Sequence, residues 1–116
     1  MAHMLAVLTA FVVLATDLTG TWKGTLIRDG RDPSPAVLVL RQEGSSVTGT
    51  AGESEDEKHP ISNGTIEGDV VTFDVAVGES SMKFELKLDG DDLSGAVVRE
   101  REGQQLTARL SLKRAK

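Results

Sequence analysis

The 116-residue chain contains no cysteine and no tyrosine, and its aromatic residues are one tryptophan and three phenylalanines. Without cysteine there is no disulfide framework, no thiol nucleophile and no cysteine-based zinc site. Tyrosine and tryptophan supply much of the rigid contact area at recognition surfaces, so their scarcity excludes a large aromatic binding platform. The net charge of −5 repels phosphate backbones, and no cluster of lysine and arginine offsets it. We therefore expect no binding to DNA or RNA.

Histidine is equally scarce, since the chain has only His3 and His59. His3 lies within residues 1–4, which resemble a vector-derived scar, and one remaining histidine makes a Ser-His-Asp triad or a multi-histidine metal site hard to build. His59 follows an acidic stretch whose carboxylates suit calcium, but the spaced calcium-loop signature is missing, which favours a solvated acidic loop. The sequence thus indicates no catalytic residue, no metal site and no cofactor, and it favours binding over enzymatic activity.

The N-terminal part contains an uncharged apolar run from Leu5 to Ala15. The run is shorter than the roughly 20 residues that span a bilayer as a helix. Its length is typical of the hydrophobic region of a signal peptide, and Val13 and Ala15 fit the −3 and −1 positions of a cleavage site. We therefore expect a scar plus signal-like segment over 1–16, export to the periplasm or the cell exterior, and a barrel domain over 17–116. If the run is retained, it requires burial, and we expect a homo-oligomer through Leu5 to Ala15.

From Leu18 onward, apolar and polar residues alternate with a period of two, which is typical of strands with one buried face. Glycine-containing turns separate the alternating runs, as short hairpins require. The pattern predicts an all-β fold, a single eight-stranded antiparallel up-and-down barrel, with a two-sheet sandwich as the alternative. The expected strands cover residues 19–28, 36–43, 46–52, 61–67, 70–78, 81–89, 92–101 and 104–114.

Two connections are longer than a hairpin turn. Residues 29–35 include two prolines, which favours a loop because proline cannot donate to a strand ladder. Residues 52–60 form the acidic stretch that ends with His59 and Pro60. We expect these two connections to lie at opposite ends of the barrel.

The start of the first strand, Leu18–Trp22, resembles that of the calycin superfamily, which includes the lipocalins and avidins. Their barrels open with a Gly-x-Trp whose indole packs across the closed end, and Thr48–Thr50 resembles an avidin Thr-Gly-Thr. The resemblance implies that Trp22 closes one end of the barrel. It also implies that an arginine of the last strand, Arg109 or Arg114, covers the indole.

The avidin ligand contacts do not carry over to this sequence. Gly24, Arg28 and Ala51 stand where avidins have Asn, Ser and Tyr. The later tryptophans that stack on biotin have no counterpart, because Trp22 is the only tryptophan. We therefore expect no biotin binding.

Extending the alternation from Trp22 places an apolar set of side chains inside the barrel. One interpretation is a filled core, and the other is a narrow apolar cavity beside Gly24, Gly49, Gly64 and Gly95. Arg28 and Arg99 continue the inward set near strand ends, where a guanidinium either binds a ligand carboxylate or pairs with an acid such as Asp32 or Glu100. The candidate ligand-binding residues are Trp22, Gly24, Arg28, Gly49, Phe73, Phe84, Gly95 and Arg99.

Three functional hypotheses follow from this interior. The first is a small secreted lipocalin-like barrel that binds a small apolar or amphipathic ligand, with a cavity of about 300 Å³ or more. The second is a structural or interaction protein with a filled barrel that self-associates through the apolar N-terminal segment. The third is a small barrel isomerase or cyclase. The sequence does not choose among them, because strand tilt and shear set the interior volume.

Overall fold

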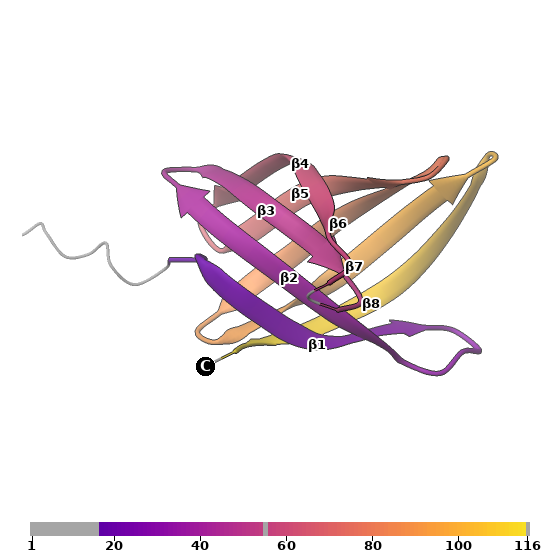
Figure 1. The fold of residues 1–116 in the computed structure, drawn as a ribbon, viewed down its shortest axis with the longest axis horizontal. Coiled ribbons are helices and arrows are strands. Elements are labelled where there is room, and N and C mark those ends of the chain that lie inside the picture. The colour runs from indigo at the N-terminus through magenta and orange to yellow at the C-terminus, as the bar shows by residue number, and fades with distance from the viewer. Residues whose placement is uncertain (1–16, 55, 116) are drawn as a thin grey trace, which may run out of the picture.

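The computed structural model describes residues 17–54 and 56–115, and over these ranges the chain forms a closed barrel of eight antiparallel strands (Figure 1). Each strand pairs with the next in the sequence, and β8 pairs with β1 to close the barrel. The predicted fold class is therefore confirmed. The strands are β1 Gly20–Arg28, β2 Ser34–Glu43, β3 Ser46–Gly52, β4 His59–Glu67, β5 Val70–Val77, β6 Ser80–Asp89, β7 Asp92–Arg101 and β8 Gln104–Arg114.

The segment Leu5 to Ala15, with the export signal and the oligomer contact predicted for it, lies outside the described residues. Within the described ranges, no helix is long and apolar enough to cross a membrane.

The period-two pattern places one set of side chains inside the barrel and the other in solvent. In β6, Phe84, Leu86 and Leu88 are buried, whereas Lys83 and Glu85 between them are exposed. The inward set of the other strands forms one continuous apolar core with these residues. This alternation is what an antiparallel sheet with one buried face requires.

Two strands begin earlier than the sequence predicts, because they include the prolines that were expected in loops. Pro35 pairs with Thr25 of β1, while the pairing of β2 with β3 extends only to Val37. Pro60 pairs with β3, and the pairing of β4 with β5 starts one residue later at Ile61. A proline is tolerated in such a position because only one neighbouring strand is present and its missing N–H is not needed.

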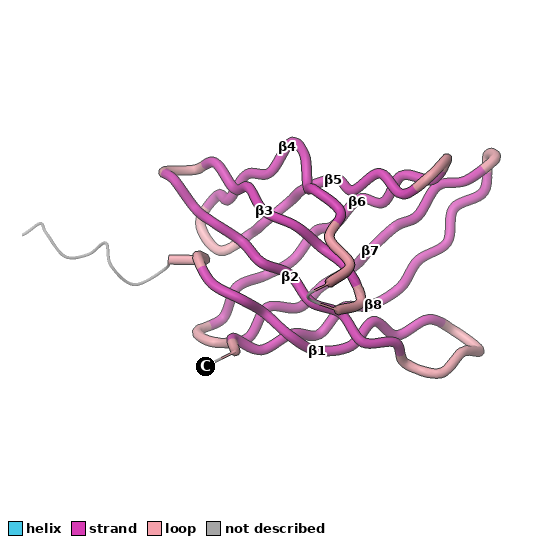
Figure 2. Tube along the Cα trace, viewed as in Figure 1, coloured by secondary structure: helices cyan, strands magenta, loops and turns pink. Residues whose placement is uncertain are grey.

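The two long connections lie at the same end of the barrel, and the prediction of opposite ends is wrong. In an antiparallel meander, β1 and β3 run in the same direction, so the connections after Arg28 and after Gly52 emerge together. We call this the open end; it also carries the β5–β6 and β7–β8 turns. The opposite, closed end carries the β2–β3, β4–β5 and β6–β7 turns (Figure 2).

Trp22 fills the closed end of the barrel. Its side chain is fully buried, and the indole Nε1–H donates a hydrogen bond to the Leu18 carbonyl at 3.0 Å. The guanidinium of Arg114 lies 4.4 Å from the centre of the indole ring and donates to the carbonyls of Asp17 and Thr19, each at 3.0 Å. Of the two arginines considered for this position, Arg114 covers the tryptophan, and Arg109 is exposed on the outer face.

The four inward glycines mark close approaches between strands rather than empty space. A Cβ atom at Gly24, Gly49, Gly64 or Gly95 would collide with a backbone carbonyl of the neighbouring strand. The interior volume beside them is therefore already occupied by backbone. These glycines let the strands approach one another closely as the sheet closes on itself.

Candidate functional site

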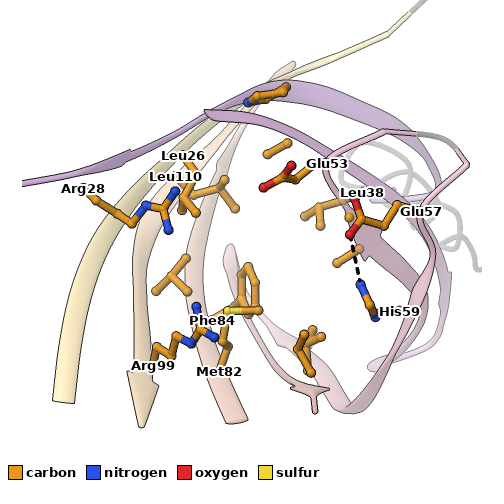
Figure 3. A pocket seen from close by; sticks show the side chains of 17 residues that line it. Leu26, Arg28, Leu38, Glu53, Glu57, His59, Met82, Phe84, Arg99 and Leu110 are labelled. Atoms are coloured by element: carbon orange, nitrogen blue, oxygen red, sulfur yellow. Dashed lines mark ion pairs between the residues drawn. The ribbon is translucent and has the colours of Figure 1, made fainter. Parts of the chain in front are cut away.

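An apolar cavity of about 170 Å³ lies inside the barrel at its open end (Figure 3). All eight strands contribute residues to its wall. The cavity volume is smaller than the value of about 300 Å³ expected for a carrier. The apolar wall consists of Leu26, Ala36, Leu38, Ala51, Val75, Val77, Met82, Phe84, Val97 and Leu110.

The cavity ends where large side chains fill the barrel. Phe84 lines it and stacks on Phe73 of the neighbouring strand, with ring centroids 4.6 Å apart and an interplanar angle of 19°. Toward the closed end, Leu88, Leu93 and Trp22 are buried in the continuous core. The closed half of the barrel is therefore filled and the open half is hollow, and the cavity does not lie beside the four inward glycines, where one of the two interpretations of the sequence places it.

Two arginines point into the mouth of the cavity from β1 and β7 (Figure 3). Arg28 donates from Nη2 to the Ser34 hydroxyl at 2.9 Å, and Arg99 donates from Nη2 to the Ser80 hydroxyl at 3.2 Å. The Nε atoms of both arginines are buried and have no hydrogen-bond partner. Each guanidinium is thus held in place by a neutral group and keeps a buried donor unused.

Pairing with Asp32 or Glu100, which the sequence left open for these arginines, does not occur. The Glu100 carboxylate accepts a hydrogen bond from the Gln105 amide at 2.8 Å instead. Among the residues that the structure describes, no carboxylate lies within 4.0 Å of either Arg28 or Arg99. Their positive charge is therefore not neutralised by a direct ion pair.

The opposite side of the mouth is acidic. Glu53 and Glu57 belong to the connection between β3 and β4, and His59 begins β4. His59 Nε2 lies 3.6 Å from Glu57 Oε2, as the dashed line in Figure 3 marks. Within the two described ranges, no group of three or more acidic, histidine or cysteine side chains is placed to hold a metal ion.

The structure divides the eight candidate residues into two groups. Arg28, Phe84 and Arg99 line the cavity. The others do not line it, because they lie in the filled core or at the close strand contacts: Trp22, Gly24, Gly49, Phe73 and Gly95. Contact of any of these residues with a ligand stays a prediction.

The acidic side of the mouth was missed by the sequence reasoning. The sequence predicts a solvated acidic loop here, at the end of the barrel opposite the 29–35 connection, whereas Glu53, Glu57 and His59 line the mouth at the same end. The strand order alone contained the signal, because the first and third connections of an eight-stranded meander emerge at the same end. Met82 also lines the cavity, although it is not among the eight candidate residues.

Comparison of the chain with models of known families, with curated proteins and with solved structures gives no match. The closed barrel and the geometry of its open end are therefore the features that bear on function.

Proposed function

We propose that this barrel binds a small amphipathic anion, with the apolar part of the ligand in the cavity and its charged group against Arg28 and Arg99. The observation that carries the proposal is the pair of arginine side chains at the mouth of an apolar cavity, each bonded to a serine hydroxyl and without a carboxylate within 4.0 Å among the described residues. Two guanidinium charges without a carboxylate partner at the mouth favour an anion there. An oxygen anion would accept hydrogen bonds from the guanidinium N–H groups that face the cavity.

The serine partners of the two arginines support an anionic ligand. A hydroxyl accepts one hydrogen bond and orients the guanidinium, but it leaves the charge and most of the donors available. The guanidinium fork matches a carboxylate in geometry and binds it through two parallel hydrogen bonds. Ser80 is 4% exposed and is the only buried polar residue in the described part of the chain, and its hydroxyl accepts the hydrogen bond from Arg99 Nη2.

The cavity volume limits the apolar part of the ligand. A dry apolar cavity of about 150 Å³ in a protein holds a molecule the size of benzene. The cavity here, about 170 Å³, fits one aromatic ring or a short branched chain. A long-chain lipid would not fit, because the stacked pair Phe73 and Phe84 and the filled core lie beneath the cavity.

The resemblance to calycins supports a binding role for the same interior. The closed meander, the buried Trp22 and its cover by Arg114 are features that the resemblance implies for a lipocalin-like barrel. Export, predicted from Leu5 to Ala15, is part of the same proposal.

The proposal is tested by isothermal titration calorimetry with 3-phenylpropionate and its neutral analogue 3-phenyl-1-propanol. We expect the carboxylate to bind at least about tenfold more tightly than the alcohol, because charge-assisted hydrogen bonds to the arginines form only with the anion. The variant Arg28→Gln/Arg99→Gln should lose this difference while its affinity for the alcohol stays the same.

The matched control is Arg41→Gln/Arg109→Gln, which removes the same charge from exposed positions on the outer face. It should keep the preference for the carboxylate. Equal affinity for the two probes in the wild type, or an unchanged preference in the Arg28/Arg99 variant, would contradict the proposal.

A further inference from the structure

We infer that the ligand is a small zwitterion, with a carboxylate on the arginine side of the mouth and an amine on the acidic side. An apolar amino acid with an aromatic or branched side chain is the simplest member of this class. The inference rests on the proposed function for the carboxylate half of the ligand. It adds a second recognition group and therefore a narrower ligand class.

The two sides of the mouth carry opposite charges that do not pair with each other. Arg28 and Arg99 come from β1 and β7, and Glu53 and Glu57 come from the β3–β4 connection, across the opening in Figure 3. Within the described ranges, no ion pair of 4.0 Å or less joins the two sides. The field across the mouth is therefore dipolar, and a head group with both charges is stabilised at both of its ends.

An anion without an amine is bound less favourably at this mouth than a zwitterion is. The Glu53 carboxylate has no cation within 4.0 Å among the described residues, and the partner of Glu57 is a histidine at 3.6 Å. Asp56 adds a further exposed carboxylate to the same connection, and the whole chain carries a net charge of −5. These charges repel an approaching anion, whereas a zwitterion has no net charge to repel.

The arrangement of the cavity below the mouth fits the shape of an α-amino acid. Its carboxylate and ammonium leave one carbon atom in two directions, and its side chain leaves in a third. The mouth has two oppositely charged sides above one apolar cavity of about 170 Å³, which accepts a ring of benzene size. One bound molecule can thus use the arginines, the carboxylates and the apolar wall together.

The experiment compares three probes with the same phenyl group by titration calorimetry at neutral pH: L-phenylalanine, 3-phenylpropionate and 2-phenylethylamine. We expect L-phenylalanine to bind about tenfold more tightly than 3-phenylpropionate, since it gains one further charge-assisted interaction. The amine should bind most weakly. The variant Glu53→Gln/Glu57→Gln should reduce the affinity for L-phenylalanine to that for 3-phenylpropionate, and it should not weaken binding of 3-phenylpropionate.

The matched control is Glu67→Gln/Glu85→Gln, which removes the same charge from exposed positions outside the mouth. It should leave the order of the three affinities unchanged, and thermal melting verifies that both variants are folded. If 3-phenylpropionate binds as tightly as L-phenylalanine, the zwitterion inference is wrong and the proposed function stands. If neither binds, or if the amine binds most tightly, both are wrong.

Discussion

At the scale of single residues, Arg114 of the last strand, β8, binds the segment that precedes β1, at Asp17 and Thr19. Its guanidinium covers the Trp22 ring and donates to two carbonyls of the residues that precede β1. The side chain is 29% exposed, so these interactions are partly shielded from water. The same region includes the hydrogen bond from the Thr19 N–H to the Asp17 carboxylate, which lowers the pKa of Asp17 below its ordinary value of 3.8.

We predict that Arg114→Met lowers the free energy of unfolding by about 2 kcal/mol, because it removes a cation–π contact, two hydrogen bonds to carbonyls and the ion pair with Asp91. Urea unfolding followed by the fluorescence of Trp22, the only tryptophan, measures the change. Arg109→Met on the outer face of the same strand is the control and should change stability much less. Equal losses in the two variants would mean that the cover of Trp22 has no special effect.

At the scale of strands, glycine decides how closely neighbouring backbones approach. Gly24 faces the backbone of β8 at Ser111 and Leu112, and a Cβ atom at this position would collide with the Ser111 carbonyl. Gly95 and Gly64 have the same relation to β6 and β3. A side chain at any of these positions would push two paired strands apart.

We predict that Gly24→Ala destabilises the protein by about 3 kcal/mol, at the upper end of ordinary overpacking costs. The control is Thr25→Ala, at the adjacent exposed position of β1, which should cost at most about 1 kcal/mol through lower β-propensity. Urea unfolding measures the comparison: if the dependence of the unfolding free energy on urea concentration is the same for both variants, the shift in midpoint gives the change in stability. A neutral Gly24→Ala would show that β1 and β8 have room between them at this point.

The strands themselves follow from the sequence, because alternation and glycine turns are local signals. Lys83 and Glu85 alternate with Phe84 and Leu86 in both the pattern and the structure, and the predicted strand ends agree with the observed ones to within two residues. The largest differences are at the starts of two strands, as at Ser34 and Pro35. The sequence predicts a loop there because of the proline, but a strand position with only one neighbouring strand tolerates proline. Whether a proline has one neighbour or two depends on tertiary structure, which a local pattern does not contain.

At the scale of the whole molecule, the barrel combines a filled half with a hollow half. Large side chains such as Trp22, Leu88 and Leu93 occupy the closed half. At the open half, Met82 and Val77 are only partly buried, and the cavity lies between them and the opposite strands. The core that stabilises the barrel and the candidate site therefore occupy different parts of one interior.

This division could not be predicted from the sequence. The inward residues are apolar at both ends, and their volumes fill or fail to fill the barrel according to strand tilt and shear. Arg28 and Arg99 could be identified as inward residues near strand ends. Their serine partners and their unpartnered Nε atoms could not, because these depend on how Ser34 and Ser80 lie on the neighbouring strands β2 and β6.

The most direct test of the account is an NMR titration of the isotope-labelled protein with 3-phenylpropionate. We predict that the methyl resonance of Met82 and the Nε–H resonances of Arg28 and Arg99 shift together and saturate, because all three groups line one cavity. The indole Nε1–H of Trp22, buried at the other end of the barrel, should not move. A shift of Trp22 without Met82, or no shift of the cavity resonances at the solubility limit of the probe, would contradict binding at the open end.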